Sequence, residues 1–190
     1  MRKARIVILS GPSGSGKTSL YKKLLASRKF RKILVKSISV TTRERRPNER
    51  HSHDYFFVSK RMFEYKKRAG HFMESQNVFG QYYGTPKQNV RRLLKSGVNV
   101  LLCIDVKGAK QVMRQHKNVL KVFVKTPTFR DLQTRLKGRK TEKSQDLSIR
   151  LQTARKELRE QQHYDYVIIN DQLEKAYRRL AKLFSQVLLV

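Results

Sequence analysis

The chain has 190 residues, of which 38% are hydrophobic, and its 44 Lys and Arg against 14 Asp and Glu give a formal net charge of +30. This length suffices for one domain with a sizeable core. No apolar run in the sequence approaches the ~20 residues that cross a bilayer, and no signal-peptide pattern opens it, so we expect a cytoplasmic protein with no membrane partner. The single cysteine, Cys103, excludes an internal disulfide and is expected to be a small buried residue rather than a nucleophile.

The order of the expected elements predicts an α/β fold around a parallel sheet, because short apolar, β-branched runs alternate with helical patterns. The expected strands are Arg5–Leu9, Leu34–Val40, Val98–Ile104, Leu120–Val124 and Tyr166–Ile169. The expected helices are Lys17–Ser27, Pro86–Lys95, Gly108–Gln115, Thr128–Leu136, Ile149–Gln162 and Leu173–Val187.

Two stretches break this alternation. Between Thr41 and Thr85, two strand-like pieces at 55–58 and 71–75 flank a short helical pattern at 59–69, which predicts a small α+β insert. Residues 138–148 are polar and basic without periodicity and predict a mobile loop between two helices. Inserts placed in this way on a phosphate-binding fold commonly close over substrates.

The first expected strand leads directly into a glycine-rich loop and a helix. The loop fits the pattern GxxxxGK(S/T), with Gly11, Pro12, Ser13, Gly14, Ser15, Gly16, Lys17 and Thr18, and Ser19 continues it into the helix. In such a loop the backbone N–H groups turn around phosphate oxygens and the helix N-terminus adds a favourable dipole. Lys17 is expected to reach the β- and γ-phosphates, and the Thr18 hydroxyl to ligate Mg²⁺. The sequence therefore predicts binding of a nucleoside triphosphate.

Five further blocks follow this loop in register. They are residues 37–59 (SISVTTRERRPNERHSHDYFFVS), 80–86 (GQYYGTP), 104–109 (IDVKGA), 135–142 (RLKGRKTE) and 164–171 (YDYVIIND). Together with the loop they resemble the guanylate kinases, nucleoside monophosphate kinases that phosphorylate GMP, over nearly the whole chain. The resemblance implies transfer of the γ-phosphoryl group of ATP to GMP, and to dGMP, giving ADP and GDP with Mg²⁺.

The resemblance also implies a three-layer, P-loop nucleoside monophosphate kinase-like fold with a central parallel sheet. Its core domain is expected at 1–36, 86–137 and 149–190. A GMP-binding insert is expected at 37–85 and a mobile lid at 138–148.

The acceptor phosphate is expected to bind to the insert. Arginine forks and tyrosine hydroxyls suit a monophosphate. The resemblance implies that Arg43, Arg46, Tyr55 and Tyr83 hold the phosphate of GMP, although a solvated basic loop is the alternative interpretation of the two arginines.

The guanine base is expected to be read by carboxylates. Guanine presents N1–H and N2–H₂ donors on the edge where adenine has an acceptor at N1 and no 2-amino group. The resemblance implies that Glu74 and Asp105 accept from this edge, helped by Ser39 and Thr85, and that Asp105 also contacts Mg²⁺ through water. The alternatives are a strand-end acid for Glu74 and a helix cap for Asp105.

Catalysis is expected to rest on cations, because phosphoryl transfer needs positioning and charge stabilisation more than a covalent nucleophile. The resemblance implies catalytic roles for Lys17, Arg43, Arg135, Arg139 and Arg150. Arg135 and Arg139 are also expected to contact ATP, and Asn170 to lie near its adenine. The chain departs from the family at Lys107 and Lys140, where Gln and Gly are usual, and neither change removes a catalytic group.

There are three alternatives to a guanylate kinase. A non-catalytic guanylate kinase-like binding module lacks the phosphate loop, which is intact here. A kinase for another monophosphate is disfavoured by the two carboxylates. A nucleic-acid-associated protein is favoured by the net charge alone, and we expect that charge to give weak, non-specific polyanion binding as a side effect. The sequence leaves the oligomeric state open.

Overall fold

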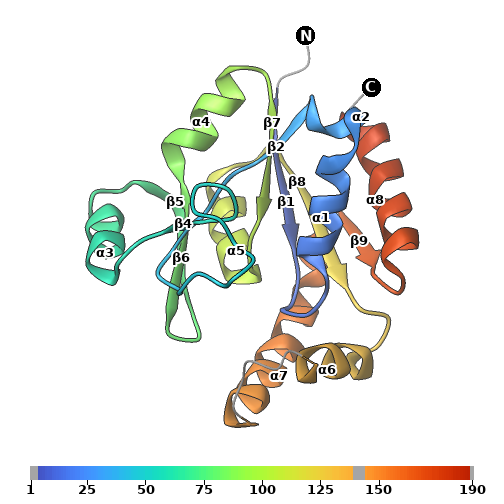
Figure 1. The fold of residues 1–190 in the computed structure, drawn as a ribbon. Coiled ribbons are helices and arrows are strands. Elements are labelled where there is room, and N and C mark those ends of the chain that lie inside the picture. Colours follow the sequence, from blue (N-terminus) through green and yellow to red (C-terminus); the bar gives the residue numbers. More distant parts are fainter. Residues whose placement is uncertain (1–3, 139–143, 189–190) are drawn as a thin grey trace.

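The computed structural model describes residues 4–138 and 144–188 (Figure 1). Its strands are β1 (Ile6–Ser10), β2 (Leu34–Lys36), β3 (Val40–Thr41), β4 (Phe56–Phe57), β5 (Phe72–Val78), β6 (Gln81–Pro86), β7 (Asn99–Cys103), β8 (Val119–Lys125) and β9 (Tyr166–Ile169). Its helices are α1 (Lys17–Ala26), α2 (Arg28–Arg31), α3 (Lys60–Arg68), α4 (Lys87–Lys95), α5 (Val106–Gln115), α6 (Phe129–Lys137), α7 (Ser144–Arg159), the 3-10 helix η1 (Glu160–His163) and α8 (Leu173–Leu188).

Five parallel strands form the core sheet in the order β2-β7-β1-β8-β9. The central strand β1 is buried along its whole length, which explains why its sequence is a continuous apolar run rather than an alternating one. Because all five strands run the same way, the segments that follow β1, β7 and β9 leave the sheet at one edge. The glycine-rich loop, Asp105 and Asn170 therefore share this edge.

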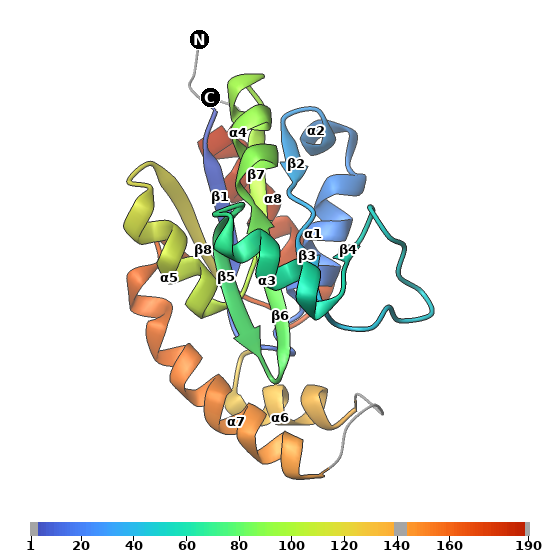
Figure 2. The same cartoon turned by 90° about the vertical axis from the view of Figure 1, so that its left-hand side faces the viewer.

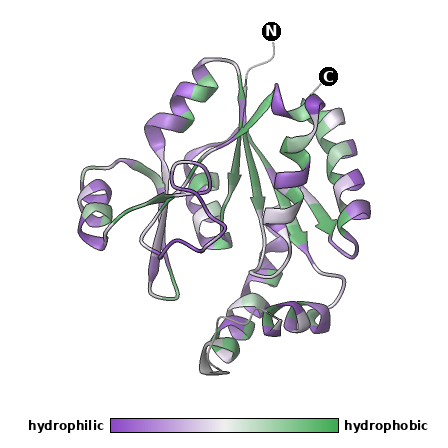
Figure 3. Ribbon diagram, viewed as in Figure 1, coloured by the Kyte–Doolittle hydropathy of each residue, from purple (hydrophilic) through white to green (hydrophobic). Residues whose placement is uncertain are grey.

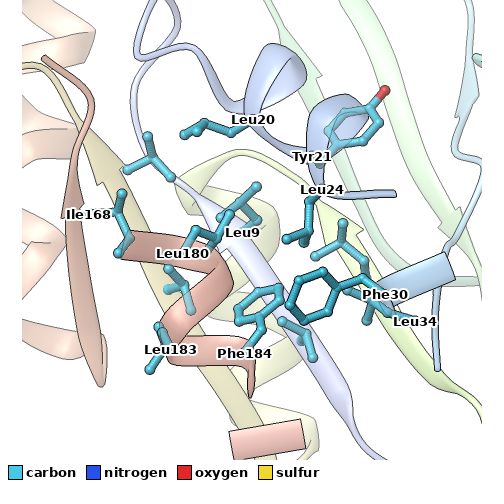
Figure 4. Close-up of a cluster of buried hydrophobic side chains, with 14 of the residues drawn as sticks. Leu9, Leu20, Tyr21, Leu24, Phe30, Leu34, Ile168, Leu180, Leu183 and Phe184 are labelled. Atoms are coloured by element: carbon cyan, nitrogen blue, oxygen red, sulfur yellow. The ribbon is translucent and has the colours of Figure 1, made fainter. Parts of the chain in front are cut away.

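Helices cover both faces of the core sheet, which gives three layers (Figures 1 and 3). On one face α1, α2 and α8 bury Leu24, Phe30 and Phe184 against the strands (Figure 4). On the other face α4 and α5 contribute Val90 and Val112 to a second cluster. In the described ranges no helix is both long and apolar enough to cross a membrane.

A second sheet of four strands, in the order β4-β3-β6-β5, forms the insert (Figure 2). Strands β5 and β6 make an antiparallel hairpin, and β3 joins β6 to the short strand β4. Helix α3 covers this sheet through Phe63, whose ring stacks on Phe72 with 4.7 Å between centroids. Ser59 caps α3, since its side chain accepts from the Met62 N–H.

The predicted α/β class and the parallel core sheet are confirmed, while several boundaries differ. Residues 34–40 form two strands instead of one, because the chain crosses from the core sheet to the insert after Lys36. Helix α2 and strand β6 were not expected; β6 contains glycine and proline and is stabilised by pairing on both sides. Helix α7 begins at Ser144 rather than Ile149, within the expected loop. Cys103 is half-buried, and burial raises the pKa of its thiol, so it stays protonated.

Phe184→Ala is expected to lower the free energy of unfolding by about 3–5 kcal/mol, because the side chain is fully buried and its removal leaves a cavity beside Phe30. Urea unfolding followed by circular dichroism measures the change. Tyr65→Ala, at a side chain that is 64% exposed, is the control and should change stability by less than about 0.5 kcal/mol. Equal losses in the two variants would contradict the assignment of α8 to the core.

Candidate functional site

The glycine-rich loop folds around its own lysine between β1 and α1. Lys17 Nζ donates to the carbonyl oxygens of Gly11 at 2.7 Å and Pro12 at 2.9 Å. Gly16 precedes α1 with a φ of 88°, a left-handed conformation that favours glycine, and a Cβ there would collide with the side chain of Asn170. The loop therefore has the tight backbone and the cation of a phosphate cradle.

A small cavity lies beside this loop. Asn170, buried directly after β9, donates from Nδ2 to the Ser15 carbonyl at 2.7 Å. Arg135 on α6 donates from Nη2 to the Asn170 carbonyl at 2.8 Å. These two side chains, together with Gly14, Gly16, Ser19 and Leu173, line a cavity of about 280 Å³. The structure thus brings both predicted residues, Arg135 and Asn170, against the glycine-rich loop.

Arg43 is held by a carboxylate that no pattern singled out. Its Nη2 donates to both oxygens of Glu49, at 2.7 and 2.8 Å, and its guanidinium carbon lies 5.6 Å from the centre of the Tyr55 ring. The Tyr55 and Tyr83 rings are 6.1 Å apart between centroids. Arg46 joins the cluster through its backbone: its N–H donates to Glu49 Oε2 at 3.1 Å and its carbonyl accepts from the Glu49 N–H at 3.0 Å, while the residue is exposed. An acid in a polar loop has no periodic signal, so the sequence did not reveal Glu49.

Glu74 is a carboxylate buried at the junction of the two sheets. It is 4% exposed, and the Thr85 hydroxyl donates to its Oε1 at 2.6 Å. Burial raises the pKa of Glu74 to about 7; the charge of Asp105 adds to this rise, while the hydrogen bonds from Thr85 oppose it. Helix α5 passes so close that a Cβ added at Gly108 would lie 2.6 Å from Glu74 Oε2.

Asp105 caps α5 at the carboxyl edge of the core sheet. Its Oδ1 accepts from the Gly108 N–H at 2.6 Å, so Asp105 is a helix cap, while its contact with guanine stays a prediction; burial raises the pKa of its carboxyl. Ser39 is buried and directly precedes β3, a strand of the sheet that also holds Glu74 and Thr85. The four residues expected to read guanine thus come from the junction of the insert and the core.

Two glutamines of α5, which were not predicted from the sequence, form hydrogen bonds to β5 at this junction. The Ser75 N–H donates to Gln111 Oε1 at 3.2 Å, and Gln115 Nε2 donates to the Met73 carbonyl at 3.3 Å. Both neighbours of Glu74 in β5 are therefore tied to α5, which fixes the strand that carries the carboxylate.

Helix α7 packs against α6, the helix that carries Arg135. Arg150 lies over the ring of Phe79, 4.7 Å from its centre, at the tip of the β5–β6 hairpin. Burial raises the pKa of Glu157 to about 7, Lys17 acts to lower it and Asp105 to raise it. The predicted catalytic residue Arg139 lies outside the described residues. Glu157 was not foreseen, because an acid beside a lysine on a charged helix is typical of a solvated face.

Oxygen donors suited to Mg²⁺ lie at the same edge of the sheet. The Thr18 residue is exposed in the first turn of α1, and Asp105 follows the neighbouring strand β7. Within the described part of the chain, no cluster of three or more His, Cys, Asp or Glu residues could hold a metal ion. Mg²⁺ commonly keeps several waters and binds through one or two protein oxygens plus substrate phosphates. These residues therefore fit a metal that arrives with a nucleotide.

The glycine-rich loop is a P-loop, and it lies at the edge of a five-stranded parallel sheet with a second small sheet inserted after β2. This arrangement defines a P-loop kinase-like protein of the nucleoside monophosphate kinase type. The family model for guanylate kinase matches residues 3–187. The chain therefore belongs to the guanylate kinase family.

Individual relatives agree with this assignment. A guanylate kinase of Rickettsia prowazekii is 38% identical over 181 residues, which cover 95% of this chain and 90% of that protein. One of Thermotoga maritima is 36% identical over 181 residues, covering 95% of this chain and 86% of that protein. The crystal structure of guanylate kinase from Anaplasma phagocytophilum superimposes with a TM-score of 0.79 at 29% identity, covering 100% of this chain and 89% of that one.

Glu74→Gln is expected to become more stable relative to the wild type as the pH rises. Because the pKa of Glu74 in the folded protein, about 7, lies above its ordinary value of 4.5, the folded state binds more protons than the unfolded state between these values. The cost of the buried charge therefore grows from about pH 5 to pH 8, and the variant, which has no such charge, should gain up to about 3 kcal/mol over the wild type. Urea titrations at both pH values measure the difference.

Glu174→Gln is the control for this experiment. The hydrogen bond from Lys23 lowers the pKa of this exposed carboxyl. Its contribution to the free energy of unfolding therefore has the opposite sign to that of Glu74 and is lost as the pH falls. That variant should show no gain at pH 8. A difference between Glu74→Gln and the wild type that stays constant from pH 5 to pH 8 would contradict the raised pKa.

Proposed function

We propose that this protein transfers the γ-phosphoryl group of ATP to GMP, and to dGMP, giving ADP and GDP with Mg²⁺. The buried Glu74–Thr85 pair at the junction with a P-loop sheet carries the proposal, in a chain of the guanylate kinase family. The relatives named above, which are guanylate kinases, support it.

Guanine recognition rests on acceptors in a dry site. Thr85 occupies Oε1 of Glu74, and the other carboxylate oxygen accepts from the N1–H or N2–H₂ group of guanine. Donors of the base favour the ionised carboxylate, so they offset the cost of its burial. Adenine offers an acceptor at N1 and leaves the carboxylate unpaired. Asp105 and Ser39 complete the pocket for the base.

The GMP phosphate takes the place of a carboxylate on Arg43. Glu49 engages the guanidinium through two short bonds, and a phosphate offers the same paired oxygens. Tyr55 and Tyr83 supply hydroxyl donors beside it; burial raises the pKa of Tyr55, which keeps its proton in place. Arg46, exposed on the same loop, adds a second guanidinium.

The transferred phosphoryl group is stabilised by cations from three elements. Lys17 is oriented by two loop carbonyls, Arg135 by the carbonyl of Asn170, and Arg150 comes from α7. Arg139 is proposed to join them. Preorganised charges of this kind lower the barrier without rearranging during the reaction.

Magnesium is proposed to enter with ATP, held by Thr18 and, through water, by Asp105. When bound it neutralises charge on the phosphate oxygens. We also propose that residues 37–85 form the GMP-binding unit, that 138–148 serve as a lid, and that the protein works in the cytoplasm.

Lys17→Ala is expected to reduce GMP-dependent ADP release at least about a hundredfold, because it removes a preorganised cation from the phosphate cradle. Lys23→Ala, which removes a surface lysine of the same helix, should retain the wild-type rate. A coupled assay of ADP release with ATP and GMP measures both variants. Activity of Lys17→Ala within tenfold of the wild type would contradict the proposed role of the loop.

A further inference from the structure

A larger cavity lies away from the nucleotide site, between the insert and α4. It has a volume of about 940 Å³, within the range of cavities that take small ligands. Its walls come from β3, β4, the end of α3 and the first two turns of α4. Nothing in the proposed transfer reaction uses it.

This cavity opens on one face of the insert sheet, and the residues proposed to bind GMP lie on the opposite face. Side chains alternate between the two faces of a strand. Phe56 of β4 lines the cavity. Its chain neighbours Tyr55 and Phe57 instead contact Arg43, whose guanidinium carbon lies 5.6 and 5.9 Å from their ring centres. Val40 of β3 likewise lines the cavity, next to Ser39 in the chain. A ligand in the cavity therefore leaves the GMP face free.

The rim of the cavity is strongly basic. Lys66, Lys87, Arg91 and Arg92 line it together with two histidines, and the lining contains no carboxylate. In residues 4–138 and 144–188, none of these four cations forms a salt bridge, and the Arg92 side chain donates to the neutral Asn89 side chain, at 3.3 Å. Among the described residues no carboxylate neutralises them, whereas Glu49 neutralises Arg43, so the rim cations can bind an external anion without displacing an acid.

The floor of the cavity is apolar and partly aromatic. Phe56, Phe72 and Pro86 contribute rings to it, and Val40 and Val58 add aliphatic surface. Phe56 and Phe72 are half-buried, so each residue keeps exposed surface, and Phe63 covers one face of the Phe72 ring. Cations around accessible rings are the combination with which proteins hold unpaired bases and their phosphates.

We propose that this cavity, which we call the rear cavity, binds single-stranded nucleic acid, with bases on Phe56 and Phe72 and phosphates on the rim cations. The net charge of +30 brings the strand to the surface, and the rear cavity gives it a place to bind. A duplex is a poor ligand, because its bases are already stacked on one another. The proposal is independent of the phosphotransferase activity and accounts for part of the charge that catalysis leaves unexplained.

The test is an anisotropy titration of a labelled 12-nucleotide oligouridylate at increasing KCl. The variant Arg91→Gln/Arg92→Gln removes two rim charges, and Arg28→Gln/Lys29→Gln removes two charges from exposed positions on α2. Loss of two phosphate contacts should weaken binding about 10–30-fold near 0.1 M salt and make the log–log salt slope shallower by about 1.4. The control should lose less than about threefold. Both variants should keep wild-type ADP release.

Three further measurements locate the strand. Saturating GMP and ATP should not displace it, inorganic polyphosphate should compete less well than the oligonucleotide, and ultraviolet crosslinks should map to residues 51–58 or 71–72. Equal losses in the two double variants would overturn the proposal, as would displacement by GMP or ATP. Equal competition by polyphosphate would also overturn it, because charge alone would then explain the binding.

Discussion

A carboxylate buried at the junction of two sheets is the constraint on which the rest of the site depends. Glu74 is held by Thr85 from the adjacent strand and lies against α5 where Gly108 leaves room for it. Its charged form is costly in this environment, and the donors of a guanine base are the partners that would offset the cost. Gln111 and Gln115, which bond α5 to β5, keep the Glu74 carboxylate in place relative to the core sheet. They thereby also fix its position relative to the P-loop at the edge of that sheet.

The cations of the site are held by partners within the chain. Lys17 bonds to two carbonyls of its own loop, Arg135 to the carbonyl after β9, and Arg43 to Glu49. Such contacts keep the charges oriented at the positions where phosphates are proposed to bind. At Arg43 the acceptor phosphate is proposed to replace Glu49. The rim cations of the rear cavity, which form no salt bridge within the described residues, contrast with Arg43, which is why an anionic ligand besides ATP and GMP is proposed there.

Much of this arrangement could be predicted from the sequence, because its signals are local. The continuous apolar run of β1 and the glycine pattern after it specify a buried parallel strand and a phosphate loop. What could not be predicted depends on tertiary contacts: the split of residues 34–40 between two sheets, the pairing that makes β6 a strand, and the pairing of Glu49 with Arg43. The resemblance pointed to Glu74 and Asp105, but only the packing of α5 against β5 explains why Glu74 is buried there.

The most direct test of the account is the choice of acceptor, measured as kcat/KM for GMP, AMP, UMP and CMP in a coupled ADP-release assay with ATP and Mg²⁺. A site whose buried carboxylate needs donors from the base should reject an analogue that lacks them by a factor of about 10⁴. The account predicts such a preference for GMP over AMP in the wild type and its collapse in Glu74→Gln, with the KM for ATP little changed. Use of AMP within tenfold of GMP by the wild type, or an unaltered preference in the variant, would contradict it.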